Sequence, residues 1–312
     1  MSRQPSRRAL LLGATAAAGT AMLGGCDRLG EAEWFRRTLK TGEDANLFVQ
    51  RLLLTERTLA PEFVEADISP WFKPNGTEDP PDRSYKALAK RKFVNYRLEV
   101  GGLVEKPFKL SLAELRKLPA RTQITRHDCV EGWSAIGKWT GVPLADLLNR
   151  AGLKPEARFV VFHCADTMGQ DGDNDGEDDG AAGDSGSQEE APAGNANPNM
   201  TKQSGGGESK KDSGGQQASE DTAASGGSPV RYYESIDLLD AFHPQTILAY
   251  EMNGQALPVA NGAPLRLRLE RNLGYKQAKY VIRVEVVESF AHIGEGKGGY
   301  WEDQGYAWYA GI

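Results

Sequence analysis

The sequence predicts an α+β fold, a strand-rich mixed domain that one long surface loop interrupts. Short runs rich in β-branched and aromatic residues recur on both sides of that loop, and a few segments of helical spacing alternate with them. Residues 169–228 instead consist mostly of Gly, Ser, Asp, Glu, Ala and Gln. Such a segment buries too little apolar surface to offset its ordering entropy, so we expect it to be a disordered insertion.

Four segments carry helix signals. Apolar residues recur at helical spacing in 43–54, and the Ser-Leu-Ala-Glu sequence of 111–114 is a capping box that opens a short helix. Pro143 suits the first turn of a further helix, with Gly152 as its C-cap. We expect a last short helix over 234–241.

Strands are expected over 93–100, 122–127, 158–162, 247–251, 265–269 and 280–288. Two Asn-Gly pairs, at 253–254 and 261–262, predict turns between them. The proline-rich stretch 69–81 must be irregular. The C-terminal residues 300–309 are too aromatic to remain in water, so we expect this tail to pack back on the domain.

The composition shifts divide the chain into four parts. We expect a signal over 1–26, an N-terminal helical segment over 27–65, one domain formed by 66–168 and 229–312, and the acidic insertion 169–228. The net charge of −6 comes from the insertion, and the rest of the chain is mildly basic. That charge suits an anionic ligand better than a nucleic acid.

The first 26 residues predict export. Arg7 and Arg8 precede the apolar, small-residue run 9–25, in a sequence that resembles a twin-arginine signal. Leu23-Gly24-Gly25-Cys26 resembles a bacterial lipobox, which would make Cys26 the acylated N-terminus and tether the protein to the inner membrane. The alternative is an ordinary cleavage site with a passenger cysteine. Either reading predicts a periplasmic or other extracytoplasmic location.

The two remaining cysteines allow three interpretations. Cys129 and Cys164 could form a disulfide in an oxidising compartment. With His127 and His163 they could instead bind zinc or copper, although their spacing matches no standard site. Alternatively, Cys129 alone could be the thiolate ligand of a cofactor metal.

The third interpretation rests on two separated motifs in order. The first is Arg126-His127-Asp128-Cys129-Val130-Glu131-Gly132-Trp133, followed by Trp139-Thr140-Gly141-Val142-Pro143-Leu144. The second is Asn261-Gly262-Ala263-Pro264-Leu265-Arg266, followed by Gly274-Tyr275-Lys276-Gln277-Ala278-Lys279-Tyr280. Over 66–168 and 230–312 the chain resembles the sulfite-oxidase family of molybdopterin enzymes, in particular the branch of periplasmic methionine-sulfoxide reductases. The resemblance implies a molybdopterin-binding fold of the sulfite-oxidase type.

The resemblance also implies site residues. Cys129 falls on the position of the metal ligand of a molybdenum-molybdopterin cofactor, and His127 beside it could orient substrate or donate a proton. The other positions that match cofactor contacts are Asn75, Cys164, Asn261, Arg266, Gln277, Ala278 and Lys279. Asn75 is equally compatible with an ordinary Asn-Gly turn. Cys164 stands where that branch has a threonine, which is a departure from the pattern.

The implied activity is two-electron oxygen-atom transfer, with reduction of S-oxides or N-oxides such as methionine sulfoxide as the leading expectation. The reverse direction, oxidation of sulfite or a related anion, is the alternative. A third possibility is a non-catalytic ligand-binding lipoprotein stapled by a Cys129–Cys164 disulfide. Without a haem-attachment motif in the chain, we expect a separate electron-transfer partner, either a haem-bearing membrane subunit or a cytochrome.

Overall fold

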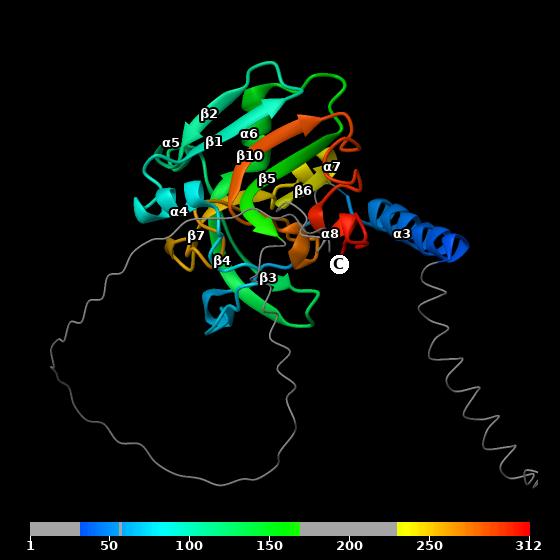
Figure 1. Cartoon of the computed structure of the whole chain (residues 1–312). Helices are drawn as coiled ribbons and strands as arrows, with labels where there is room; N and C mark the ends of the chain where they lie inside the picture. Colours follow the sequence, from blue (N-terminus) through cyan, green and yellow to red (C-terminus); the bar gives the residue numbers. More distant parts are fainter. Residues whose placement is uncertain (1–31, 56–57, 169–229) are drawn as a thin grey trace, which may run out of the picture. The chain divides into compact units, whose positions relative to one another are not determined.

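The computed structural model describes residues 32–55, 58–168 and 230–312 (Figure 1). The expected signal, Cys26 and almost all of the expected insertion lie outside these residues. Strands β5 (Phe159–Met168) and β6 (Val230–Asp237) pair antiparallel, with Phe159 opposite Asp237. The segments before and after the insertion therefore belong to one sheet.

The first sheet has the strand order β2-β1-β10-β5-β6. Its remaining strands are β1 (Arg97–Gly102), β2 (Phe108–Ser111) and β10 (Val281–Val287). β1 and β10 run parallel, with Val100 opposite Val284, whereas the other pairs in this sheet are antiparallel. The first sheet is therefore a mixed sheet.

The second sheet has the order β3-β4-β7-β8, and β9 also pairs with β7. Its strands are β3 (Arg121–Asp128), β4 (Ser134–Pro143), β7 (Ile247–Met252), β8 (Gln255–Ala256) and β9 (Arg266–Arg268). Asn253 and Gly254 both have positive φ, as a tight β7–β8 hairpin requires. One continuous apolar core includes side chains from both sheets.

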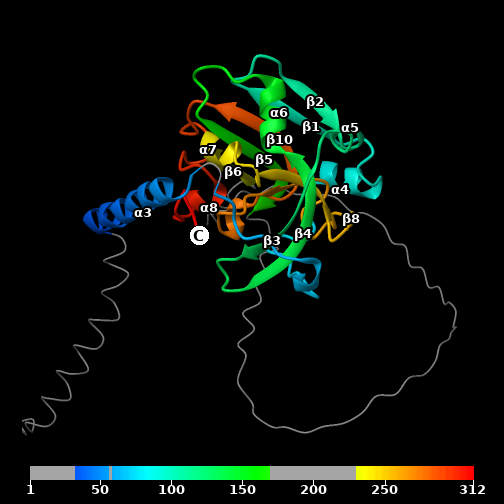
Figure 2. The same cartoon turned by 180° about the vertical axis from the view of Figure 1, so that it is seen from behind.

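Helices cover the sheets and connect them (Figure 2). They are α3 (Glu33–Leu53), α4 (Arg83–Lys90), α5 (Leu112–Leu115), α6 (Leu144–Ala151), α7 (Leu238–Ala241) and α8 (Tyr300–Asp303), with 3₁₀ turns η1 (Glu65–Asp67) and η2 (Gly274–Lys276). The expected capping box opens α5, where the Ser111 side chain accepts from the Glu114 N–H. Gly152 ends α6 at φ 68°, a conformation that glycine adopts without a Cβ clash. None of the described helices is long and apolar enough to cross a membrane.

The predicted helix over 234–241 is wrong in its first half. Residues up to Asp237 extend β6, because their backbone groups pair with the neighbouring β5, and only the four residues of α7 are helical. Asp237 caps α7 by accepting the Asp240 N–H. The strand predicted over 93–100 begins only at Arg97, since Lys92 and Phe93 adopt positive φ in a turn.

The aromatic C-terminal tail packs on the domain, as expected. Trp308 stacks against Phe290, and its indole N–H donates to the Ser235 hydroxyl at 2.9 Å. Beside it, the buried Lys276 ammonium donates to Glu234 and to Glu302 of α8. This ion triad ties the tail to β6, because separating a buried charge from its partners is costly.

Candidate cofactor site

Cys129 lies immediately after β3, in a tight turn. Its N–H donates to the Trp133 carbonyl at 3.0 Å, and its carbonyl accepts from the Gly132 N–H at 3.1 Å. Gly132 has a φ of 84°, which favours glycine there. The thiol is unpaired and mostly buried. Burial raises its pKa, and the neighbouring Glu131 carboxylate raises it further.

His127 lies on the buried face of β3 with Gln123 and Thr125, because side chains two residues apart point to the same side of a strand. Its ring is fully buried and packs against Phe72 and Trp133. Burial lowers the pKa of His127 far below its usual value, and the nearby guanidinium groups of Arg266 and Arg268 lower it further. The imidazole is therefore neutral at pH 7.

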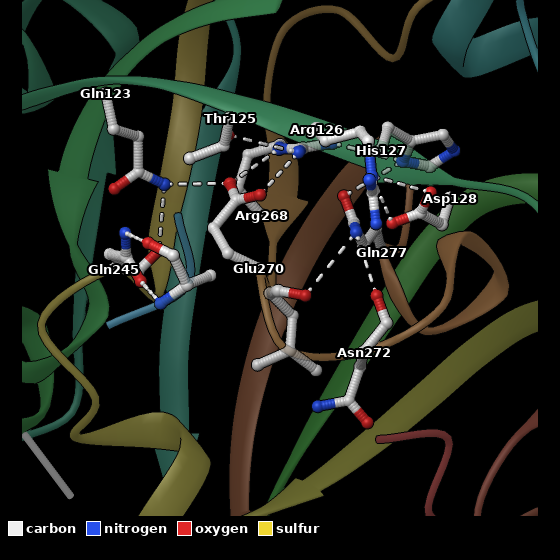
Figure 3. Close-up of polar contacts among 12 residues, drawn as sticks. Gln123, Thr125, Arg126, His127, Asp128, Gln245, Arg268, Glu270, Asn272 and Gln277 are labelled. Atoms are coloured by element: carbon white, nitrogen blue, oxygen red, sulfur yellow. Dashed lines mark hydrogen bonds and ion pairs between the residues drawn. The ribbon is translucent and has the colours of Figure 1, made fainter. Parts of the chain in front are cut away.

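A polar network surrounds His127 (Figure 3). Its Nδ1 lies 3.2 Å from both the Gln277 Oε1 and an Arg268 guanidinium nitrogen. Arg268 also donates to both carboxylate oxygens of Glu270, at 2.9 and 2.6 Å. Gln123, on the same face of β3, donates to Glu270 at 2.8 Å. The network fixes the orientation of the His127 ring.

Backbone groups around η2 complete this side of the site. Gln277 directs its amide nitrogen to the Asn272 carbonyl at 3.2 Å, which turns its oxygen toward His127. The carbonyl of the buried Ala278 accepts from the Leu267 N–H at 2.8 Å. A Cβ at Gly274 would stand 2.5 Å from the His127 ring, so only glycine permits this close approach.

Arg266 and Lys279 form a second cationic group on the Cys129 side. Arg266 is fully buried and donates to the Asn75 side-chain oxygen at 2.9 Å and to the Asn261 carbonyl at 3.2 Å. Lys279 donates to the Thr77 carbonyl at 2.6 Å. Burial and the neighbouring Arg268 lower the pKa of Arg266 to about 9. Burial and Arg266 lower that of Lys279 to about 7.

The indole of Trp139 lies beneath both arginines. The guanidinium carbon of Arg268 stands 4.3 Å from its ring centroid, and that of Arg266 stands 5.5 Å away. Trp139 itself is fully buried in β4. Cation–π attraction and the ring's bulk hold the two cations side by side despite their repulsion.

The structure thus brings together most of the residues singled out in the sequence. Contacts connect Asn75, Arg266 and Asn261, and others connect His127 with Gln277, while Cys129 lies near Arg266. The sequence reasoning missed Arg268, Glu270 and the polar face of β3. The signal for this face was present in the sequence: the polar residues Gln123, Thr125 and His127 alternate along a strand where a core face would be apolar.

Cys164 lies elsewhere. It is fully buried in the middle of β5, opposite Val281 of β10, among core side chains. Burial raises the pKa of its thiol well above the usual value, and Asp166 and Glu234 add to the rise. A cofactor contact of Cys164 therefore remains a prediction.

Two interpretations of the cysteines are wrong. Cys129 and Cys164 are both free thiols, in segments of two different sheets, so the disulfide is absent. Within the described residues, no group of three or more His, Cys, Asp or Glu side chains could hold a metal ion, which removes the zinc or copper site. Ligation of a cofactor metal by Cys129 stays a prediction.

The donor set fits an anionic cofactor. Three buried cations, Arg266, Arg268 and Lys279, surround the site, and one of them is neutralised by Glu270. Three N–H donors of the site, the Arg266 Nε, the Asn261 Nδ2 and the Trp139 Nε1, are buried without a hydrogen-bond partner among the described residues. Buried donors of this kind are normally satisfied, so they point to an acceptor such as a phosphate.

An unpaired thiol beside a buried cationic cluster is the arrangement that a redox site for an anionic, metal-bearing cofactor needs. Known proteins that are similar to this chain belong to the same class. The oxidoreductase molybdopterin binding domain model matches residues 86–179 and 210–292. A candidate protein-methionine-sulfoxide reductase subunit, YedZ1, from Azospira oryzae is 33% identical over 308 residues, which cover 98% of this chain and 88% of that protein. The protein-methionine-sulfoxide reductase catalytic subunit MsrP of Xanthomonas axonopodis pv. citri is 31% identical over 65% of this chain and 48% of that protein.

The chain therefore belongs to the sulfite-oxidase family of molybdopterin-binding oxidoreductases, and its strand-rich α+β fold is that of the family's cofactor domain. It aligns with about half of the length of the MsrP relative. Among solved structures, the sulfane dehydrogenase SoxCD from Paracoccus pantotrophus is similar at 20% identity and a TM-score of 0.40, over 63% of this chain and 39% of that chain.

The lowered pKa of Lys279 predicts pH-dependent anion binding by cofactor-free protein. With a pKa of about 7, Lys279 loses its charge between pH 6 and pH 8. We expect the affinity for sulfate, an anion that does not titrate in this range, to fall about tenfold over that interval. Isothermal titration calorimetry measures the affinity.

Lys279→Arg is the control for this titration, since arginine keeps its charge across the interval. Its sulfate affinity should change less than about twofold.

The titration of Lys279 also affects the stability of the folded protein. The unfolded chain keeps the Lys279 proton up to a pH near 10.4, so the folded cofactor-free protein should gain stability as the pH rises from 7 toward 10. A wild-type affinity that does not change with pH would contradict the assignment.

Proposed function

We propose that this protein is a molybdenum-cofactor oxidoreductase that reduces S-oxides or N-oxides, with methionine sulfoxide as the leading substrate. The observation that carries the proposal is the unpaired Cys129 thiol beside a cationic site that fits an anionic cofactor. Support for the substrate class comes from relatives named as methionine-sulfoxide reductase subunits.

Cys129 would be the protein's ligand to the metal, because a soft thiolate suits molybdenum already bound by sulfur. Arg266 and Lys279 would hold the cofactor's phosphate, with Asn75, Asn261 and the 277–279 backbone as further contacts. When bound, the cofactor would supply two-electron oxygen-atom transfer.

The chain's own residues would then manage protons and substrate. Reduction of a sulfoxide takes two electrons and two protons and releases the sulfide and water. Neutral His127 lies two residues from Cys129 and is oriented by Gln277 and Arg268. It would hold or pass one proton near the reacting oxygen.

Oxidation of sulfite or a related anion is the second candidate. An anionic substrate needs convergent cations, and the structure places Arg266 and Arg268 together above Trp139. The third possibility, a lipoprotein stabilised by a Cys129–Cys164 disulfide, is not supported because both thiols are free.

The sequence supports a location outside the cytoplasm. The twin-arginine-like start would export the folded, loaded protein, and acylation of Cys26 would tether it to the membrane. Electrons would come from a separate partner, either a haem-bearing membrane subunit or a cytochrome. A tether would raise the local concentration near a membrane partner.

The test is metal content together with turnover in both directions. Full-length protein exported from a cofactor-competent host is analysed for molybdenum and pterin, then assayed with reduced viologen dye for reduction of methionine sulfoxide. The same preparation is assayed with ferricyanide for sulfite oxidation. About one molybdenum per chain with sulfoxide turnover supports the proposal. If the protein oxidises sulfite and does not reduce sulfoxides, the second candidate function is supported instead. A metal-free, inactive protein overturns both candidates.

A further inference from the structure

Helix α3 exposes a continuous apolar face. Six of its large apolar side chains are between 47% and 71% exposed, namely Trp34, Leu39, Phe48, Val49, Leu52 and Leu53. At about 100° per residue they occupy roughly one half of the helix circumference. The charged residues of the helix fall on the other half, among them Arg37, Lys40 and Asp44.

At its C-terminal end, α3 contacts the domain through its charged side and not through its apolar face. Arg51 in the last turn of α3 donates to Asp237 at 2.7 Å and to Asp240 at 2.8 Å, and its guanidinium lies 4.9 Å from the Tyr309 ring centroid. Leu47, on the same side of the helix, is half-buried. These contacts fix the C-terminal end of α3 with its apolar face turned away from the domain.

We propose that α3 is an amphipathic membrane-surface helix, which lies in the headgroup region of a bilayer with this apolar face buried in lipid. The helix has 21 residues, a length that could span a membrane, but its charged side excludes that arrangement. A helix with one broad apolar face and one strongly charged face lies in the interface instead.

The sequence around α3 favours lipid over a protein as the occupant. Trp34 stands at its start, and aromatic rings of this kind concentrate at membrane interfaces. Arg37 and Lys40 lie on the polar side of its first half, where they suit anionic headgroups. Cys26 of the lipobox-like sequence precedes the helix by only seven positions. An acyl chain on Cys26 would place the start of α3 at the bilayer surface.

The domain surface next to α3 also exposes apolar side chains. α7 contains Asp240, to which Arg51 binds, and it leaves Leu239 and the following Phe242 partly exposed. A bilayer that receives α3 could therefore also meet the α7 turn. The ion pairs of Arg51 with Asp237 and Asp240 would then hold the cofactor domain in a fixed position at the membrane surface.

Vesicle flotation tests the proposal. Cofactor-loaded protein that begins at residue 26, without the apolar signal 9–25, and carries Cys26→Ser, which cannot be acylated, is mixed with vesicles of phosphatidylcholine containing phosphatidylglycerol and centrifuged through a density gradient. We expect the protein to float with the vesicles. Phe48→Ser with Leu52→Ser should lower the bound fraction at least about tenfold, since each apolar side chain adds substantially to partitioning.

The matched control removes two exposed apolar side chains from other surfaces, with Val64→Ser and Val94→Ser in the same Cys26→Ser background. That protein should float like its parent. Molybdenum content reports folding in every variant. A parent that stays at the bottom of the gradient overturns the proposal. So does light scattering that shows a dimer dissociated by the Phe48 and Leu52 changes, because the occupant is then a second copy. Neither result affects the oxidoreductase assignment, which the turnover assay tests separately.

Discussion

Cys129→Ser should abolish turnover while the domain remains folded. An alkoxide is a harder ligand than a thiolate, and a serine hydroxyl loses its proton far less readily, so the metal would lose its soft protein ligand. We expect sulfoxide reduction to fall at least about 10³-fold, an effect of about 4 kcal/mol on the barrier. Steady-state assays with reduced viologen dye, normalised to chain concentration, measure the loss.

Cys164→Ala is the matched thiol control. Its side chain lies in the core of β5, where the change leaves a small cavity and costs about 1 kcal/mol of stability. Turnover should fall far less than in Cys129→Ser, because a buried cofactor contact can be lost without removing the metal ligand and the Cys164 thiol lacks the access that a metal ligand needs. Equal losses in the two variants would contradict the assignment of Cys129 as the metal ligand.

Local signals predicted the elements that local chemistry determines. The capping box of α5, the glycine that ends α6 and the Asn-Gly turn after β7 are specified within a few residues, and all three are confirmed. The first half of the 234–241 segment was mistaken for a helix, because its pairing with β5 lies across the 60-residue insertion. β4 was missed because its four glycine, serine and proline positions, Ser134, Gly137, Gly141 and Pro143, weaken a strand signal.

The residues of the candidate site also divide into those that a sequence motif predicts and those that only the structure identifies. Motif resemblance selected Cys129, His127, Arg266 and Lys279, and the structure places them around one cationic cluster. It did not select Glu270, whose role depends on its burial with Arg268, two residues away, and on the hydrogen bond from Gln123 of the distant strand β3. A charge that balances buried cations is recognisable only when distances are known.

Glu270 is the acidic member of the buried cationic cluster, and its removal should be the most destabilising single polar change in the site. Glu270→Gln keeps the shape but leaves Arg268 without its ion pair, in a place where both side chains are fully buried. Breaking a buried pair by removing one partner costs about 3–5 kcal/mol. We expect the free energy of unfolding of cofactor-free protein to fall by about that amount in urea titrations.

Two further variants separate this charge effect from lost packing. In Arg268→Met with Glu270→Met the buried charges disappear together, so the double variant should be more stable than Glu270→Met alone, a non-additivity that the double-mutant cycle of these two changes measures. Glu99→Gln removes the carboxylate of an exposed ion pair with Lys109 and should cost no more than about 1 kcal/mol. Sulfate should restore more stability to Glu270→Gln than to the wild type, because the variant leaves an additional buried positive charge for the anion to offset. If Glu270→Gln cost no more than Glu99→Gln, the cluster would not depend on its carboxylate, and the case for a site built to receive an anion would lose its electrostatic basis.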